Sequence, residues 1–375
     1  MRLLILTDSF APKIDGVAET AGILRRSLVQ RGHHVTVIAP EPASAAVDDG
    51  TVLRIPAFPL PNYPEVRMGY RLDRLKQAVE AAAPDAALLL TMGPIGLAGA
   101  YLLPRHTRLI HVYTTDMPSY LRTYHFGFLE RVLDRVLRSL GERCVATLCP
   151  SELIRDDLAR RGVAGLGVWG RGVDTDLFGP ERRSEAMRAR LTHGQPDRPL
   201  VLYVGRLARE KRILDLLAAT RQLRTTRFAF VGDGPMRGHL ERVFPADRTV
   251  FTGYLRGLPL AEAFASADVF AFPSDTDTFA QVVLQALASG VPAVVPAGTA
   301  PAQFVTDGVS GLHAPARSPG DFAAAVARIV CDEPLRHALA TGALASVEGR
   351  SWEALIDPLE ALLVRSVPSL EAFVR

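Results

Sequence analysis

The order of apolar and polar positions along the chain predicts two successive series of short strands and amphipathic helices. In the first half, short and nearly continuous apolar runs are typical of strands buried on both faces: "RLLILTDS", "HHVTVIAP", "TVLRIP", "DAALLLT", "TRLIHVYTT" and "VATLCPS". Between the first two runs, Val17, Ala21, Leu24 and Leu28 recur at helical spacing and stop before Gly32. Strands that alternate with helices in this way indicate a parallel sheet with helices on both faces.

The pattern restarts after a polar, arginine-rich stretch, "FGPERRSEAMRARLTHGQPDRP", which we interpret as a domain boundary. The strand candidates that follow are "PLVLYVG", "RFAFVGDG", "TVFTG", "DVFAFPS" and "VPAVVP". We therefore expect an α/β protein with two doubly wound, Rossmann-like domains, residues 1–178 and 195–350, whose strand ends face one shared cleft. The last helical stretch, about 352–375, is a candidate to pack back on the first domain.

Composition narrows the class of protein. At 375 residues with 48% hydrophobic and 22% charged residues, the chain is globular and too long for one ordinary core. A net charge of +3 argues against nucleic acid as the main partner and leaves an anionic small molecule or a lipid surface open. The three cysteines form no CxxC pair, which favours free thiols in a reducing compartment.

No long apolar run indicates export or a membrane span. The chain contains no stretch of eighteen consecutive apolar residues, and the run in "MRLLILTDSF" is too short for a signal peptide. We expect a cytoplasmic protein, with peripheral association with a membrane left open. The helical stretch 129–140 carries an apolar stripe beside several arginines, and we interpret that stripe as core packing rather than as a membrane-binding face.

Two cations follow the first strand of the second half. In "VGRLAREKR", Gly205 and Arg206 stand directly at the strand end, and Lys211 lies five residues after Arg206. Lysine occurs at only two other positions, Lys13 and Lys76, among 43 cationic residues. A flat guanidinium and a compact ammonium suit a diphosphate, on which negative charge develops when it leaves. The alternative is a pair of ordinary surface charges.

A glycine pair follows the next strand, in "VGDGPMRG". Gly232 and Gly234 would let the backbone approach a nucleotide, but a tight turn without a ligand explains them equally well. The third glycine is one position late for the dinucleotide-binding fingerprint, and no acidic residue follows at the expected distance. A nicotinamide-dependent dehydrogenase is therefore disfavoured.

The segment "SDTDTFAQVVLQALASGVP" predicts a helix that starts near Phe279 and ends at Gly290, capped by Asp277 or Thr278. The positive end of this helix would bind an anion through three backbone amides, those of Phe279, Ala280 and Gln281. Asp277 would accept hydrogen bonds from sugar hydroxyls, and Gln285 could reach hydroxyls farther along a nucleotide. The alternative is a capped, buried helix with one exposed glutamine.

Candidate residues in the first half lie in two loops. "SFAPKIDGVAET" joins a strand to a helix, and Gly16 at its end would let the backbone approach a ligand. "HVYTTDMPSYLRTYHFG" gathers polar and aromatic residues, among them Thr114, Asp116 and Tyr120, which suit a hydroxylated acceptor. A polar loop without a function is the alternative.

Together these motifs resemble family 4 of the retaining glycosyltransferases, which have the two-domain GT-B fold. The resemblance rests on "TDSFAPKIDGVAETAGILRRSLVQRGHHVTVIAP", "RGVDTDLF", "VGRLAREK", "VGDGP", "FTGYL", "ADVFAFPSDTDTF" and "ALASGVPAVVP", which occur in the family's order. The first motif and "YTTD" are most similar to the branch that holds sulfoquinovosyl-diacylglycerol synthases and bacterial alpha-mannosyltransferases.

The resemblance implies transfer of a sugar from a nucleoside diphosphate sugar to an acceptor hydroxyl of a lipid, saccharide or secondary metabolite, with retention and without a metal. It implies that Arg206 and Lys211 hold the diphosphate and that Gly16 contacts it from the other domain. The family has glutamates where this chain has Asp277 and Gln285, and many relatives have a histidine at Thr114. A sugar-nucleotide epimerase and a catalytically impaired sugar-nucleotide-binding partner protein remain the alternatives.

Overall fold

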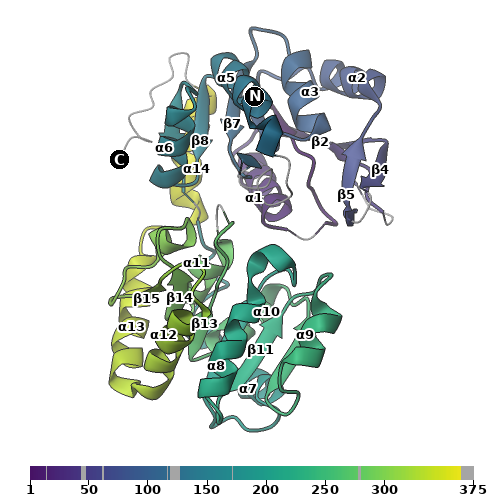
Figure 1. Cartoon of the computed structure of the whole chain (residues 1–375). Helices are drawn as coiled ribbons and strands as arrows, with labels where there is room; N and C mark the ends of the chain where they lie inside the picture. The colour runs from purple at the N-terminus through teal and green to yellow at the C-terminus, as the bar shows by residue number, and fades with distance from the viewer. Residues whose placement is uncertain are drawn as a thin grey trace. The chain divides into compact units, whose positions relative to one another are not determined.

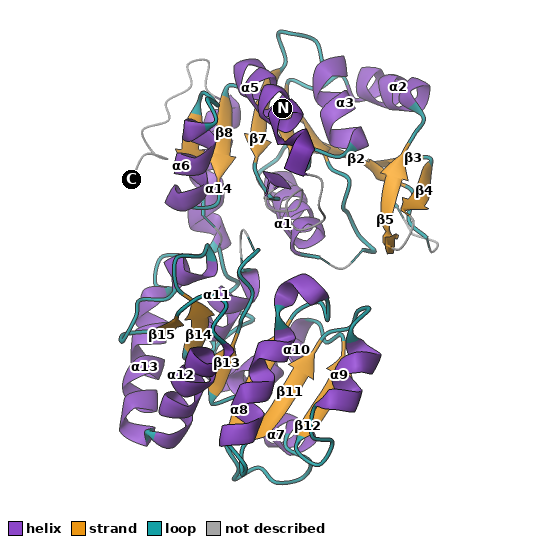
Figure 2. Cartoon of the chain, viewed as in Figure 1, coloured by secondary structure: helices purple, strands orange, loops and turns teal. Residues whose placement is uncertain are grey.

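The computed structural model describes residues 1–13, 15–43, 48–60, 63–115, 117–118, 127–170, 172–277 and 280–364. The chain forms two compact units: one comprises Met1–Gly170 together with the chain from Glu353 onward, and the other comprises Arg171–Trp352. Each unit contains a parallel sheet with helices on both faces (Figure 1, Figure 2). The three cysteines are free.

The sheet of the first unit has seven strands in the order β3-β2-β1-β6-β7-β8-β9. These strands are β1 (Arg2–Leu6), β2 (His34–Pro40), β3 (Val52–Ile55), β6 (Ala86–Leu89), β7 (Arg108–Val112), β8 (Ala146–Cys149) and β9 (Leu166–Val168). The helices are α1 (Gly16–Gln30), α2 (Leu72–Ala82), α3 (Pro94–Leu102), α5 (Glu130–Arg143), α6 (Glu152–Arg160) and α14 (Trp352–Val364), with the 3-10 turn η1 (Gly127–Leu129). A separate antiparallel pair, β4 (Ala57–Leu60) and β5 (Tyr63–Gly69), was not predicted.

The sheet of the second unit has six strands in the order β12-β11-β10-β13-β14-β15. They are β10 (Leu200–Val204), β11 (Arg227–Val231), β12 (Thr249–Gly253), β13 (Val269–Ala271), β14 (Ala293–Pro296) and β15 (Gly311–Ala314). The helices are α7 (Glu185–Leu191), α8 (Leu216–Gln222), α9 (Arg237–Val243), α10 (Gly257–Ala265), α11 (Gln281–Ala288), α12 (Pro319–Cys331) and α13 (Glu333–Ser346). Four 3-10 turns complete the unit: η2 (Pro180–Arg182), η3 (Arg209–Lys211), η4 (Ile213–Asp215) and η5 (Pro301–Phe304).

The stretch expected to separate the domains belongs to the second unit. Its helix α7 carries Arg188, whose guanidinium is buried and donates to the carbonyl oxygens of Pro196 (2.9 Å), Arg198 (2.7 Å) and Ser266 (2.6 Å). It also pairs with Asp268, at 2.8 Å. A charged residue that is fully hydrogen-bonded inside the protein holds its segment in place, and arginine content alone does not reveal this.

Candidate functional site

Two loops of the second unit meet where its strand order reverses. Strands β10 and β13 are neighbours in the sheet, although two other strands separate them in the chain. The cation turn, residues 205–212, follows β10, and the carboxylate loop, residues 272–277, follows β13. In an open α/β sheet, ligands bind in the crevice at such a switch point. The fold therefore places the predicted cations and Asp277 where a ligand is expected.

Backbone hydrogen bonds hold the cation turn against the loop that follows β11. The amide of Gly205 donates to Val231 O at 2.9 Å, and that of Leu207 donates to Asp233 O at 2.9 Å. Leu207 O in turn accepts from the amide of Met236 at 2.8 Å. Because these bonds are reciprocal, the backbone of the turn is fixed within this unit.

The glycines of the "VGDGP" motif have a packing role in this arrangement. Gly232 and Gly234 have φ values of +139° and +155°, which other residues rarely adopt. A Cβ atom at Gly232 would lie 2.0 Å from Gly205 O, and one at Gly234 would lie 2.6 Å from Leu207 O. The close approach that requires glycine is therefore an approach between two loops of the protein itself.

Each predicted cation has a carboxylate partner. Lys211 Nζ lies 2.5 Å from Asp277 Oδ1, which links the cation turn to the carboxylate loop. Arg206 Nη2 donates to Glu210 Oε1, and Thr276 Oγ1 donates to Glu210 O at 3.4 Å. The sequence predicted that one anion would face both cations and that Asp277 would face a sugar. In this structure the nearest anions are two carboxylates of the same unit.

The helix after the carboxylate loop begins later than predicted. Helix α11 starts at Gln281, and its N-cap residue is Ala280, which has the left-handed values φ 42° and ψ 48° and makes no side-chain cap hydrogen bond. The predicted cap by Asp277 or Thr278 is therefore wrong. Thr278 and Phe279 lie outside the described residues. A non-glycine residue in this conformation costs of order 1 kcal/mol or more, so the surrounding packing must hold it there.

The two glutamines of α11 are both buried. Gln281 Nε2 donates to Gly172 O at 2.7 Å, while its Oε1 has no hydrogen-bond partner among the described residues. Gln285 is 3% exposed, so the alternative of an exposed glutamine is wrong, and its contact with a nucleotide stays a prediction. The second oxygen of Asp277, Oδ2, is also buried without a hydrogen-bond partner among the described residues. Two buried acceptors beside the switch point are the kind of groups that a hydroxylated ligand satisfies.

In the first unit, Gly16 is the first residue of α1, next to the capping residue Asp15. Asp15 Oδ1 accepts from the amides of Val17 (3.0 Å) and Ala18 (2.8 Å), and Asp15 Oδ2 pairs with Lys13 at 2.9 Å. Burial acts to raise the pKa of Asp15, but the charge of Lys13 and the hydrogen bonds outweigh it and lower the pKa. The residue beside Gly16 thus stays ionised and fixes the start of the helix.

Asp8 was not singled out from the sequence, although it follows β1 at the switch point of the first sheet. Its carboxylate accepts from Thr91 Oγ1 (2.6 Å) and from the amides of Ile95 (2.9 Å) and Gly96 (3.1 Å). Burial raises the pKa of Asp8, and these hydrogen bonds oppose the rise. Its position directly after a buried strand is the signal that could have identified it.

The predicted acceptor residues are only partly described. Thr114 lies just after β7, is buried, and donates its hydroxyl to Leu90 O. Asp116 and Tyr120 lie outside the described residues. The hydroxyl of Thr114 therefore has a partner within the first unit, and its role toward an acceptor stays a prediction.

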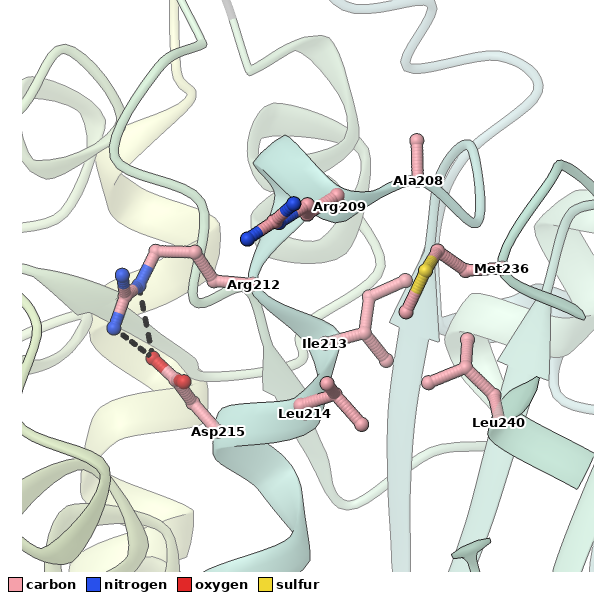
Figure 3. Close-up of a pocket in the computed structure, with 8 residues that line it drawn as sticks. All are labelled: Ala208, Arg209, Arg212, Ile213, Leu214, Asp215, Met236 and Leu240. Atoms are coloured by element: carbon pink, nitrogen blue, oxygen red, sulfur yellow. Dashed lines mark hydrogen bonds and ion pairs between the residues drawn. The ribbon is translucent and has the colours of Figure 1, made fainter. Parts of the chain in front are cut away.

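A cavity of about 140 Å³ lies next to the cation turn (Figure 3). It is lined by Ala208, Arg209, Arg212, Ile213, Leu214, Asp215, Met236 and Leu240. The guanidinium of Arg212 pairs with Asp215 at one side, and Met236 and Leu240 form the opposite wall. Arg206, Lys211 and Asp277 do not line this cavity, so it is distinct from the predicted donor site.

Among the described residues, no group of three or more histidine, cysteine, aspartate or glutamate side chains lies close enough together to bind a metal ion. No described helix combines the length and the apolar character that crossing a bilayer requires.

Comparison with known proteins assigns the family. The profile described as Glycosyltransferase Family 4 matches residues 14–177, and that of Glycosyl transferases group 1 matches residues 198–332. A GDP-mannose-dependent alpha-mannosyltransferase of Mycobacterium tuberculosis is 34% identical over 371 residues, which cover 96% of this chain and 95% of that protein. The chain belongs to glycosyltransferase family 4. This confirms the resemblance, the enzyme class and the transfer of a sugar from a nucleotide sugar to an acceptor.

Other relatives of this family 4 glycosyltransferase point the same way. Sulfoquinovosyl transferase SQD2 of Arabidopsis thaliana is 31% identical over 310 residues, 80% of this chain and 60% of that protein. Among solved structures, sucrose-phosphate synthase from Thermosynechococcus elongatus has a TM-score of 0.79 at 21% identity, covering 96% of this chain and 97% of the other. The Anabaena protein HepE in complex with UDP-glucose has a TM-score of 0.72 at 18% identity, covering 96% and 99%. The predicted GT-B fold is confirmed, with two Rossmann-like domains.

Proposed function

We propose that this glycosyltransferase transfers a mannosyl group from GDP-mannose to an acceptor hydroxyl with retention of the alpha configuration. The observation that carries the proposal is the pairing of Lys211 with Asp277 across the switch point, which supports a donor site in which Lys211 binds phosphate and Asp277 binds the sugar. The donor is inferred from the mycobacterial relatives, which are named as GDP-mannose-dependent enzymes. The mannosyltransferase and sulfoquinovosyl transferase relatives are named as transferases, which favours transfer over an epimerase or a binding protein without catalysis.

The proposed donor site combines both cations with backbone groups. Arg206 and Lys211 stabilise the departing diphosphate, and the amides of Ala280 and Gln281 at the start of α11 contribute positive partial charge. The contact of Gly16 with the diphosphate stays a prediction. Asp277 accepts from a sugar hydroxyl.

The proposed reaction is a front-face substitution. The bond between the anomeric carbon and the diphosphate breaks, the acceptor oxygen bonds to the same face, and the acceptor proton moves to the departing phosphate oxygen. A double displacement would need a second carboxylate about 5 Å from the first on the other side of the sugar. The sequence offers only Asp277 near the sugar, which favours the front-face route.

Nucleotide titration tests the donor assignment. Calorimetric titration of the full chain with GDP, UDP, dTDP and ADP should give the tightest binding for GDP, and GDP-mannose should be hydrolysed slowly without an acceptor. Tighter binding of UDP than of GDP would overturn the proposed donor while leaving the family unchanged. EDTA should not lower turnover, because the protein supplies the positive charge at the diphosphate.

We further propose that the acceptor is a lipid and that the protein meets it at a membrane surface. Contrary to the core-packing interpretation, Val132 of α5 is 51% exposed, and Phe128 of the preceding turn η1 is 76% exposed. Arg131, Arg135 and Arg138 are exposed on the same side, and none forms an ion pair with a described residue. We call these five residues the α5 face.

Two of the three acids of α5 do not neutralise that face, because Glu130 and Asp134 both lie toward Arg161, at 3.9 and 2.8 Å. The third, Glu142, is exposed four residues after Arg138, so three arginines of this side stand against one acid. Exposed apolar side chains beside an excess of arginines suit an anionic lipid surface. Relatives of the chain include an alpha-monoglucosyldiacylglycerol synthase of Streptococcus pneumoniae, whose name contains a lipid product.

Vesicle co-sedimentation tests the α5 face. The wild-type protein should sediment with vesicles that contain phosphatidylglycerol and remain in solution with phosphatidylcholine alone. The double substitution Val132→Asp, Arg135→Glu should abolish sedimentation, whereas Leu258→Asp, at an exposed leucine of the other unit, should not. Equal sedimentation of wild type and the double variant would rule this surface out.

A further inference from the structure

Glu210 has the most buried side chain in the two ion pairs Arg206–Glu210 and Lys211–Asp277. Its side chain is 8% exposed, against 28% for Arg206, its partner. A buried carboxylate is costly unless a cation or hydrogen-bond donors compensate it, and here Arg206 Nη2 supplies that compensation. Glu210 O also accepts from Thr276 Oγ1 of the carboxylate loop at 3.4 Å. One residue therefore contacts the donor-site arginine and the loop that carries Asp277.

The backbone of the cation turn does not depend on the Glu210 side chain. Tyr203 Oη donates to Arg206 O at 3.2 Å, and the amides of Gly205 and Leu207 are bound by the loop after β11. Burial, and then the charges of Asp277 and Glu210, raise the pKa of Tyr203, so this hydroxyl remains a donor. These bonds hold the main chain, but they do not orient the long, flexible side chain of Arg206.

We propose that Glu210 is a positioning residue for donor binding: it holds the guanidinium of Arg206 toward the donor diphosphate and acts only through Arg206. The inference rests on the proposed function. An acid next to a diphosphate site repels the ligand, so its presence there needs a compensating benefit. If Glu210 already orders the Arg206 side chain before the donor binds, the loss of side-chain entropy no longer reduces the affinity for the donor. Arginine has five N–H donors, so its pairing with Glu210 leaves capacity for phosphate oxygens.

GDP titration of single and double variants tests this inference. Glu210→Ala should weaken GDP binding about tenfold or more, and Glu210→Gln should stay within about threefold of wild type, because its amide oxygen still accepts from Arg206. In an Arg206→Ala background, Glu210→Ala should have no further effect. If Glu210→Ala does not fold, Glu210→Met replaces it, because methionine has a similar side-chain volume but no strong hydrogen-bond acceptor. The same loss of GDP affinity is expected for this variant.

Glu241→Ala is the matched control. Glu241 accepts from Arg237 at 2.8 Å with the same four-residue spacing in the same unit, and its loss should leave GDP affinity unchanged. Tighter GDP binding in both Glu210→Ala and Glu210→Gln would show that Glu210 mainly repels the ligand. Equal losses with and without Arg206 would show a merely structural role. Absence of GDP and UDP binding by the wild-type protein would instead contradict the proposed function.

Discussion

At the scale of single residues, the donor site depends on how two cations divide their contacts. Lys211 pairs with Asp277 of the carboxylate loop, whereas Arg206 pairs with Glu210 of the same turn. An ammonium has three donors and a guanidinium has five, so both retain capacity for phosphate oxygens. The charges of these two pairs sum to zero, so the two cations act through oriented donors more than through net charge.

Removal of either cation should lower turnover while the fold remains intact. We expect Arg206→Ala and Lys211→Ala each to lower kcat/KM with GDP-mannose by about a hundredfold or more, because each loses a donor to the leaving diphosphate. Steady-state kinetics give this value, and circular dichroism checks the fold. Lys76→Ala, at an exposed lysine of α2, is the control and should retain wild-type rates. Wild-type rates in both site variants would refute the leaving-group site.

His111 should make the stability of the protein dependent on pH. The residue is fully buried in β7, and burial lowers its pKa from 6.5 to about 3. Below pH 6.5 the unfolded chain takes up a proton that the folded chain does not, so stability falls as the pH falls. The free energy of unfolding should decrease by about 2 kcal/mol between pH 7.5 and pH 5.

Urea denaturation across that range measures the effect. His111→Leu should remove this pH dependence even if it changes the stability at neutral pH. His106→Gln, at an exposed histidine of the same unit, should retain it. Parallel pH profiles for wild type and His111→Leu would contradict the assignment.

At the scale of elements, the cation turn needs the loop that follows β11. A methyl group at Gly232 would lie 2.0 Å from Gly205 O, so Gly232→Ala should displace the turn that carries Arg206. We expect loss of GDP binding and a destabilisation of more than about 1 kcal/mol, the cost of the backbone conformation alone. Gly298→Ala separates the two effects, because Gly298 has φ +71° but open space around its Cβ position. If the two variants have equal GDP affinity and equal stability, the close approach of Gly232 to Gly205 O does not contribute to donor binding.

Helix α5 shows what periodicity does and does not determine. Its apolar stripe was interpreted as core, and Leu137 and Leu140 are buried as expected. Leu129 and Val132, on the first turns, are exposed. Periodicity predicts which residues share one face of a helix. How much of that face is buried depends on other elements, distant in sequence, that pack against it.

At the scale of the whole molecule, α14 returns to the first unit after the second unit is complete. Five of its side chains are buried: Trp352, Ile356, Leu359, Leu362 and Leu363. Glu360 pairs with Arg31 (2.6 Å) and His33 (2.8 Å), and Leu355 O accepts from Trp169 Nε1 at 2.9 Å. The end of the described chain is thus part of the first unit's core.

Truncation of one α14 leucine should destabilise the first unit. Leu359→Ala removes a fully buried side chain and should lower the free energy of unfolding by about 2–5 kcal/mol. In a Trp352→Phe background, Trp169 is the remaining tryptophan and reports this unit by fluorescence during urea denaturation. Val364→Ala, on the exposed side of the same helix, should shift the midpoint little. An unchanged midpoint for Leu359→Ala would contradict the packing of α14.

Much of the fold was predictable because buried parallel strands are apolar along their whole length. The strands "PLVLYVG" and "RFAFVGDG" appear as β10 and β11, and Gly290 follows α11 with a positive φ of 71°. The β4–β5 pair and β9 escaped prediction. Strands β4 and β9 have only four and three residues, which carry too little periodicity, and β5 has no continuous apolar run. The late start of α11 also escaped it, since Ala280 carries no capping signal and is held by tertiary packing.

By itself, the sequence determined the two-domain α/β architecture, the family, and the residue types of the donor site, because apolar patterning and motif order are local properties. Only the tertiary structure decided the pairings: Lys211 with Asp277, Arg206 with Glu210, and the glycines of "VGDGP" with the cation turn. It also decided the burial of Gln285 and the exposure of Val132. These features depend on which strand ends become neighbours in the sheet, and that adjacency brings together residues far apart in the chain.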